Sequence, residues 1–277
     1  MRFLNRASLL IVVLILVSCS LQSIDKAPPP AAPTSSHGSA PEASVPAETV
    51  STTGSAWQEI QPGMHMRSML PGGDRLAEII AIRIDPALFT FRAHYRPGQP
   101  LDITGWQEYL PGAAVIINAN FFDPENRIVG LLISDGIVHG WAYTDRGGMF
   151  AVQNGIPRIR SNTADPYQGE AIEQAVQAFP MLVQDGVAAY TNPEDTRVRR
   201  RTAIGQDVEG SIIFMVTPVA GMSLPDFSAF LASSDLNLVN AFNLDGGGST
   251  MMYASDGAYL LRSFEPVPAV LAAYPRQ

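Results

Sequence analysis

Cysteine is almost absent from this chain, whose 277 residues include a single one, Cys19. If Cys19 carries a modification, no thiol remains, so a disulfide framework, a cysteine nucleophile and a thiolate metal site are all excluded. A folded domain must then be stabilised by burial of apolar side chains. The roughly 220 residues that follow the N-terminal segments are ample for one hydrophobic core.

Basic residues are also scarce. The chain has 18 Lys and Arg residues against 26 Asp and Glu residues, which gives a formal net charge of -8 at pH 7. Because affinity for nucleic acid comes from neutralising phosphates with basic side chains, so acidic a chain is a poor candidate for a nucleic-acid partner. Its overall field would not steer an anionic substrate either. Any phosphate-binding site must therefore be built locally.

The apolar run at residues 8–17 is too short to span a bilayer comfortably, and no stop-transfer pattern follows it. Two arginines precede the run, and it leads into residues 16–19, LVSC, which are similar to a bacterial lipobox. We therefore predict a lipoprotein signal peptide over residues 1–18 and a lipid on Cys19. A short membrane anchor, or an ordinary signal peptide with a chance cysteine, is the alternative interpretation.

This prediction places the protein in the cell envelope, attached to a membrane through the lipid on Cys19. Ser20 is compatible with the periplasmic side of the outer membrane if the organism is Gram-negative. Residues 19–56 consist mainly of Pro, Ala, Ser, Thr and Gly, a composition that cannot form a core. They predict a disordered tether that holds the domain of residues 57–277 off the membrane.

Beyond the tether, strand patterns outnumber helical ones. Four Asp-Gly or Asn-Gly pairs lie between β-rich stretches and predict hairpin turns, at residues 135–136, 154–155, 185–186 and 256–257. Residues 78–85 and 88–95 alternate or run apolar on either side of an Asp-Pro pair, and they predict a further hairpin.

Helical signals are few. They are restricted to residues 102–110, to a segment that begins after Ser223, and less clearly to residues 170–179. Strands and helices do not alternate regularly, which argues against a doubly wound sheet. We therefore expect a single α+β domain, with a large mixed, mainly antiparallel sheet and few helices packed on it.

The most informative segment for function is residues 243–250, which read NLDGGGST. An apolar strand pattern ends there at Asp245. Three glycines then allow a sharp turn whose N–H groups can surround an anion, and two hydroxyl residues follow. A carboxylate beside an anion site suits cleavage of a bond next to a phosphate or a sugar. A glycine-rich turn that Asp245 merely caps would have the same sequence.

A second polar segment, residues 118–123 or NANFFD, follows another buried strand pattern. The amides of Asn118 and Asn120 could bind sugar hydroxyls, and an aromatic ring could cover the sugar. Asp123 would add a carboxylate. The alternative is a turn in which Asn and Asp cap backbone groups while the two phenylalanines enter the core.

One basic cluster stands out, at residues 197–201, which read RVRRR. Its last member, Arg201, leads directly into a strand pattern, and arginine suits bidentate binding of phosphate. A solvated charge run is the alternative for some of these arginines. The four histidines have no metal-ligand spacing, and common metal and nucleotide motifs are missing, so we expect no metal and no cofactor.

Five motifs then occur in a recognisable order, at residues 117–123, 130–136, 201–205, 221–224 and 243–250. In this order they resemble the phosphodiester glycosidase family, whose members cut a sugar from the phosphate attached to its anomeric carbon. The resemblance implies three catalytic residues, Asp245, Asp123 and Arg201. It also implies a set of substrate-binding residues: Asn118, Asn120, Phe122, Thr202, Gly246, Gly247, Gly248, Ser249 and Thr250.

The reaction that the resemblance implies passes through an oxocarbenium-like transition state and releases a phosphate as an anion. Arg201 and the glycine amides would stabilise the leaving phosphate. Asp245 would be the nucleophile or the base that activates water, with Asp123 as the second carboxylate. The expected substrate is a sugar phosphodiester or an envelope glycan.

Two other functions remain open at this point. One is a phosphodiesterase that uses a divalent ion held by Asp123 and Asp245. The other is a non-catalytic lipoprotein that binds envelope glycans.

Overall fold

A computed structural model describes residues 53–276. The predicted signal peptide, Cys19 and nearly all of the predicted tether therefore lie outside the described residues. By their internal contacts, the described residues belong to one compact unit. Within the described part, no helix has the length and apolar character that a membrane span requires.

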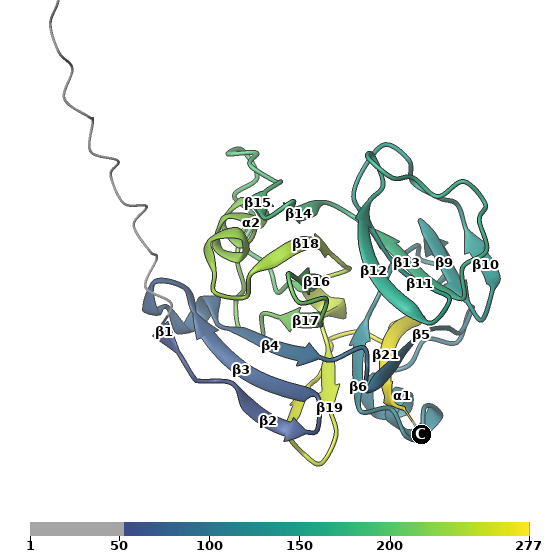
Figure 1. Cartoon of the computed structure of the whole chain (residues 1–277), viewed down its shortest axis with the longest axis horizontal. Helices are drawn as coiled ribbons and strands as arrows, with labels where there is room; N and C mark the ends of the chain where they lie inside the picture. Colours follow the sequence, from purple (N-terminus) through teal and green to yellow (C-terminus); the bar gives the residue numbers. More distant parts are fainter. Residues whose placement is uncertain (1–52, 277) are drawn as a thin grey trace, which may run out of the picture. The chain divides into compact units, whose positions relative to one another are not determined.

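Three larger sheets and a two-stranded ribbon form the fold (Figure 1). The first sheet has nine strands in the order β1-β3-β4-β17-β16-β18-β14-β15, with β2 also paired to β3. Its strands are β1 (Thr53–Gly54), β2 (Gln58–Gln61), β3 (Met64–Leu70), β4 (Ile79–Ile84), β14 (Met181–Gln184), β15 (Val187–Ala188), β16 (Thr202–Asp207), β17 (Ile212–Val216) and β18 (Leu238–Asn243).

The second sheet has the order β20-β19-β6-β21-β5, and the third has the order β10-β9-β13-β11-β12. The strands of the second are β5 (Phe89–Tyr95), β6 (Val115–Asn118), β19 (Met252–Ala254), β20 (Tyr259–Leu261) and β21 (Ala269–Pro275). Those of the third are β9 (Leu131–Ser134), β10 (Ile137–Gly140), β11 (Gly148–Gln153), β12 (Ile156–Ser161) and β13 (Gln174–Ala178). The ribbon pairs β7 (Phe121–Phe122) with β8 (Ile128–Val129).

Two α-helices occur in residues 53–276, α1 (Ile103–Tyr109) and α2 (Leu224–Ser233). Both begin where the sequence predicts. The Asp102 side chain accepts a hydrogen bond from the Gly105 amide at 2.8 Å, and the Ser223 hydroxyl accepts one from the Asp226 amide at 3.2 Å. Each cap satisfies a backbone donor that the first helical turn leaves free. Three short 3₁₀ turns, η1 (Pro71–Gly73), η2 (Arg75–Ala77) and η3 (Gly247–Ser249), complete the elements.

The prediction of a mainly antiparallel fold with few helices is confirmed, and the term α+β is only approximate for so β-rich a fold. Two details differ from the expectation. The strands divide among three sheets where one large sheet was expected, and every strand pair in residues 53–276 is antiparallel, so none of the sheets is mixed. Antiparallel pairs need only short connections, which agrees with the many turn signals in the sequence.

The four predicted Asp-Gly and Asn-Gly hairpins are all present, as β9–β10, β11–β12, β14–β15 and β19–β20. In each turn both residues have positive φ; Asp135 has 50° and Gly136 has 79°, for example. This geometry suits the right-handed twist of the strands, and Asn, Asp and Gly tolerate it best.

Two local predictions are wrong. The strands within residues 78–95 exist, but β4 pairs with β3 and β17 whereas β5 pairs with β21. The Asp85 side chain accepts the Ala87 amide at 2.8 Å, and the chain turns there from the first sheet into the second. Residues 170–179 contain strand β13 where a helix was considered, because that segment is buried between β9 and β11.

The sheets share one core. Phe91 of the second sheet packs edge-on against Phe150 of the third, with ring centroids 5.6 Å apart, and against Phe214 of the first at 6.1 Å. All three rings are buried. The three sheets therefore meet at Phe91, and none of them needs to bury its apolar face alone.

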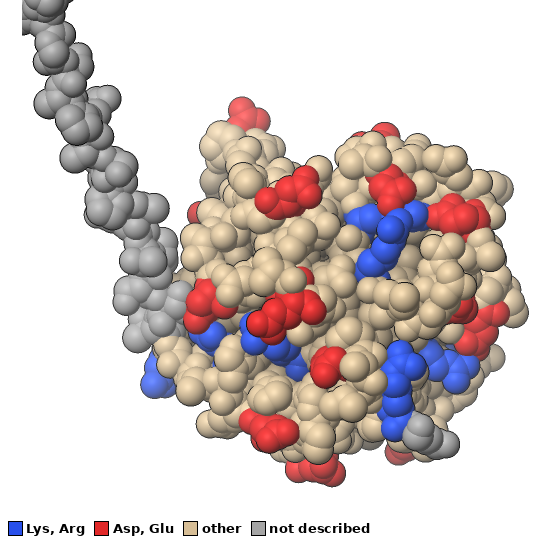
Figure 2. Space-filling model, in the orientation of Figure 1, with Lys and Arg blue, Asp and Glu red and all other residues tan. Residues whose placement is uncertain are grey.

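On the face shown in Figure 2, arginine side chains are interspersed with aspartate and glutamate and do not form a broad basic area. Several arginines are in ion pairs, among them Arg158 with Asp165 and Arg146 with Asp145. A site for a negatively charged group therefore has to be sought in local geometry.

Candidate active site

The glycine segment, residues 245–250, lies where the first sheet meets the second. As β18 ends, the Leu244 amide donates to the Thr202 carbonyl at 2.8 Å. One residue later the Asp245 amide donates to the Ala119 carbonyl at 3.0 Å, at the end of β6. Because the chain crosses between two sheets at this point, Asp245 is held from both sides.

Asn118 stabilises the passage of the chain between the two sheets through three hydrogen bonds. Its side-chain amide donates to the Asp245 carbonyl at 2.6 Å, while its Oδ1 accepts from the Thr202 hydroxyl at 2.8 Å and from the Met251 amide at 3.1 Å. Asn118, Thr202 and the glycine segment, which are far apart in the sequence, are thus brought together as predicted. Both the amide nitrogen and the amide oxygen of Asn118 are hydrogen-bonded within the protein. Its role in this structure is therefore to hold the backbone of the site in position.

The glycines are needed for close approach. Gly247 has a φ of 63°, and its amide donates to the Arg200 carbonyl at 2.7 Å. A Cβ on Gly246 would lie 2.9 Å from that same carbonyl oxygen, and a Cβ on Gly248 would lie 2.7 Å from Oε1 of Glu265. A larger residue at Gly246 would therefore push against backbone, and one at Gly248 would displace the Glu265 side chain.

The Asp245 carboxyl group is half-buried, and its Oδ1 accepts a hydrogen bond from the Gly246 amide at 2.8 Å. Burial raises the pKa of Asp245 to about 6. The Ser249 hydroxyl and the Gly246 amide act to lower the pKa, whereas the negative charge of Glu265 raises it further. A carboxyl that titrates near neutral pH inside a fold can carry a proton during catalysis.

Glu265 is the candidate residue that the sequence did not reveal. It lies in the exposed loop between β20 and β21, and its Oε1 accepts a hydrogen bond from the Ser249 hydroxyl at 3.2 Å. The loop is tied to the glycine segment by the Phe264 amide, which donates to the Gly248 carbonyl at 2.7 Å. No motif surrounds Glu265, so only the pairing of β19, β20 and β21 brings it to Asp245.

The Arg201 guanidinium is bound to backbone carbonyls outside the glycine segment. Its Nε donates to the Met222 carbonyl at 2.9 Å and its Nη2 to the Arg197 carbonyl at 2.7 Å. Within residues 53–276, no hydrogen bond or ion pair joins Arg201 to Asp245. Burial lowers the pKa of Arg201.

Arg200 is the guanidinium that contacts the end of the glycine segment. Its Nη2 donates to the carbonyls of Thr250 and Arg262, and its Cζ lies 4.6 Å from the ring centroid of Phe264. The residue is only 6 % exposed, burial lowers its pKa, and no ion pair of the described chain includes it. A buried positive charge thus lies beside the segment with no acidic partner.

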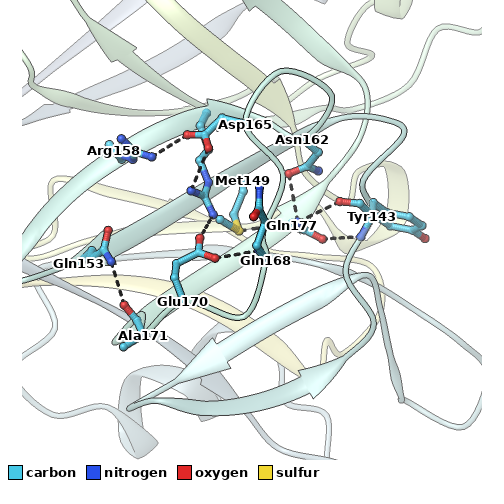
Figure 3. A network of polar contacts seen from close by, with 11 residues as sticks. Tyr143, Met149, Gln153, Arg158, Asn162, Asp165, Gln168, Glu170, Ala171 and Gln177 are labelled. Carbon is cyan, nitrogen blue, oxygen red and sulfur yellow. Dashed lines mark hydrogen bonds and ion pairs between the residues drawn. The ribbon is translucent and has the colours of Figure 1, made fainter.

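Asn120 connects the site to the third sheet. Its Nδ2 donates to the carbonyls of Leu131 and Gln177, both at 2.9 Å. The Gln177 side chain is bound in turn to Asn162 and to the backbone of Tyr143 (Figure 3). The buried Oδ1 of Asn120 accepts no hydrogen bond from residues 53–276, and neither does the Thr250 hydroxyl oxygen.

Phe122 and Asp123 lie in other surroundings. Phe122 packs against the apolar cluster around Trp106 of α1. Asp123 lies in the turn between β7 and β8, where its Oδ2 accepts the Arg127 Nε at 2.7 Å. Hydrogen bonds from the Arg127 backbone and side chain lower the pKa of Asp123. Neither side chain has a recorded contact with Asp245 in the described chain.

A cavity of about 760 Å³ lies elsewhere, lined by residues of β9, β10, β13 and the loop before β13. Its carboxylates are already engaged: Asp135 with Arg92, Glu170 with Arg160, and Glu173 with backbone amides. We therefore place the candidate site at the glycine segment, where Asp245, Glu265 and Arg200 are found, and not at this larger cavity. The described residues contain no group of three His, Cys, Asp or Glu side chains that could hold a metal ion.

The sequence model of the phosphodiester glycosidase family matches residues 111–273. The chain belongs to this family. The matched range includes β6 with Asn118, the glycine segment and the loop that carries Glu265. No curated protein sequence matches the chain.

Solved structures share the fold. The catalytic domain of zebrafish N-acetylglucosamine-1-phosphodiester alpha-N-acetylglucosaminidase, auto-inhibited by its pro-peptide, is 19% identical with a TM-score of 0.55, over 83% of this chain and 85% of that one. A hypothetical protein from Synechocystis is 16% identical with a TM-score of 0.54, over 78% and 63%. A protein from Burkholderia pseudomallei is 14% identical with a TM-score of 0.52, over 76% and 74%.

Proposed function

We propose that this protein hydrolyses the glycosidic bond of a sugar-1-phosphodiester. Membership of the phosphodiester glycosidase family supports the type of reaction. The observation that carries the proposal is Asp245, a half-buried carboxyl group whose pKa is raised to about 6 and which stands at the start of a glycine segment with a cation beside it.

In the reaction, water attacks the anomeric carbon and the bond from that carbon to the phosphate oxygen breaks. Asp245 takes the proton from the water, and the bonding electrons leave with the phosphate. The products are the free sugar and a phosphate monoester, and Asp245 then returns its proton to solvent. Since a phosphate ester leaves as an anion, the leaving group needs little protonation, and stabilising its charge matters more.

The positive charge for the phosphate would come from Arg200 and from the amides of the glycine segment. Arg201 was the expected cation, but its guanidinium is held by the carbonyls of Arg197 and Met222. Arg200 instead lies against Thr250 and keeps an uncompensated charge. In a partly buried site such a charge acts through a low dielectric, so it need not touch the phosphate to stabilise it.

The sugar would lie against Phe264. This ring is 81 % exposed, and the guanidinium of Arg200 lies 4.6 Å from its centroid and supports it. An exposed aromatic ring next to Glu265 offers a flat apolar surface to a pyranose ring. The zebrafish relative is named for an N-acetylglucosamine-1-phosphodiester, so that sugar is the first to test. Location in the cell envelope through a lipid on Cys19 belongs to the same proposal.

The test uses the mature chain and N-acetylglucosamine 1-(methyl phosphate), with products followed by ³¹P and ¹H NMR. We expect free N-acetylglucosamine and methyl phosphate, and in ¹⁸O-labelled water the label should enter the sugar and not the phosphate. Asp245→Asn should lower kcat by roughly 100-fold or more, because the proton acceptor is lost. Recovery of N-acetylglucosamine 1-phosphate would instead indicate cleavage of the P–O bond by a phosphodiesterase. Binding without turnover would indicate a glycan-binding lipoprotein.

A further inference from the structure

We infer that Glu265 is the second carboxylate of this active site, held over the glycine segment by the Ser249 hydroxyl. The inference rests on the proposed function and names the residue whose negative charge faces the positive charge that develops on the anomeric carbon. Glycosidases commonly require two carboxylates with different tasks.

The geometry holds Glu265 over the glycine segment. Its Oε1 accepts the Ser249 hydroxyl at 3.2 Å, and it lies so close to Gly248 that a Cβ there would come within 2.7 Å. The neighbouring amide of Phe264 fixes the loop to the Gly248 carbonyl. Glu265 is therefore placed over the turn that follows Asp245, by two separate contacts with that turn.

Within the described residues, no paired cation screens the negative charges of Glu265 and Asp245 from one another. Glu265 is the charged residue whose field acts on Asp245, and no ion pair of the described residues includes either of them. Among the nearby arginines, Arg200 is bound to carbonyls, and Arg262 donates to the Thr104 hydroxyl. Asp123, in contrast, is neutralised by Arg127 within its own turn.

Asp245 and Glu265 lie in different surroundings, so we assign them different roles in the reaction. Asp245 is half-buried and carries the proton of the attacking water. Glu265 is exposed in the loop over the glycine segment, where its carboxylate stabilises the oxocarbenium-like transition state. Two neighbouring carboxyls in unlike environments commonly separate into a proton carrier and a permanent anion.

The test compares Glu265→Gln with Glu209→Gln, since each change replaces one exposed carboxylate by an amide of the same shape and Glu209 follows β16 at the end opposite Thr202. With the mature chain and N-acetylglucosamine 1-(methyl phosphate), Glu265→Gln should lower kcat by about 100-fold with little change in KM, because a transition-state charge is lost. Glu209→Gln should stay within about threefold of the wild type. Thermal unfolding of each variant checks that the fold is intact.

A second readout is the pH profile of kcat/KM. The wild-type rate should fall below about pH 6 as Asp245 becomes protonated. Glu265→Gln removes a negative neighbour, so Asp245 should ionise more readily and the acid limb should move to lower pH. In Glu265→Asp the charge is restored on a shorter side chain, and the limb should return toward its wild-type position.

Full activity in Glu265→Gln, or an unmoved acid limb, would overturn the role of Glu265 while leaving the proposed function intact if Asp245→Asn is inactive. If the wild type does not release free sugar, the proposed function fails and the inference fails with it. The two failures are therefore distinguishable in one set of assays.

Discussion

At the scale of single residues, Asp245 shows how burial and reactivity are connected. Taking a carboxylate out of water disfavours its charged form, which is why its pKa rises to about 6. The backbone around it is held by Asn118 and by the Ala119 carbonyl, which fixes the position from which the side chain extends. Ionisation of Asp245 should therefore lower the free energy of unfolding.

We predict that Asp245→Asn stabilises the fold at neutral pH. The pKa of Asp245 is raised in the folded state, so its contribution to stability is complete below about pH 4 and is lost as the pH rises through about 6. At pH 7.5 the variant should be more stable than the wild type by up to about 3 kcal/mol. At pH 3.5 the two should differ little; urea unfolding at both pH values measures this.

Asp123→Asn is the control for this prediction, because the pKa of Asp123 is lowered in the folded state whereas that of Asp245 is raised. Hydrogen bonds from Arg127 lower the pKa of Asp123, so its stabilising contribution is present at neutral pH and fades as the pH falls. This variant should not be more stable than the wild type at pH 7.5. Equal stability of Asp245→Asn and wild type at that pH would contradict the raised pKa.

At the scale of elements, the glycine segment joins the two sheets and also carries the site. Its contacts differ along its length: Gly246 lies against the Arg200 backbone, whereas Gly248 lies against the flexible end of the Glu265 side chain. Backbone cannot move aside easily, but a side chain can rotate. The two positions should therefore respond differently to the same substitution.

We predict that Gly246→Ala mainly lowers stability and Gly248→Ala mainly lowers activity. The new Cβ in Gly246→Ala meets a backbone oxygen at 2.9 Å, which should cost about 1–3 kcal/mol. The new Cβ in Gly248→Ala displaces Glu265, so kcat should fall by about tenfold or more while the unfolding midpoint barely changes. Urea unfolding and steady-state kinetics on both variants separate the two effects. The reverse pattern would show that these contacts are assigned wrongly.

At the scale of the whole molecule, the core depends on the meeting of three sheets. Phe91, Phe150 and Phe214 each come from a different sheet, and their edge-on contacts make Phe91 a shared packing residue. The active-site segment crosses between two of these sheets. A change in the shared core should therefore lower the stability of all three sheets together, in one cooperative unfolding transition.

We predict that Phe91→Ala destabilises the domain by about 3–5 kcal/mol, since it removes a buried ring and leaves a cavity. Circular dichroism during urea unfolding should still show a single transition, at lower urea. Phe264→Ala is the matched control, because that ring is 81 % exposed and its removal should change the unfolding midpoint little. A separate early transition in Phe91→Ala would mean that the sheets unfold independently.

Sequence patterns were reliable for the two-residue turns and for the helix caps. The Asp-Gly and Asn-Gly turns and the caps of α1 and α2 depend on neighbouring residues, and all of them are present. The pairing of β4 and β5 could not be read in the same way. Both segments form strands, but partner choice depends on distant strands such as β17 and β21.

The sequence by itself determined the family, the mainly antiparallel strand content, and the grouping of Asn118, Thr202 and the glycine segment, because ordered motifs and local propensities carry that information. Only the tertiary structure decided that Glu265 stands beside Asp245 and that the Arg201 guanidinium faces carbonyl groups. The direction of a side chain and the approach of a distant loop depend on packing across the whole chain, which no short segment encodes.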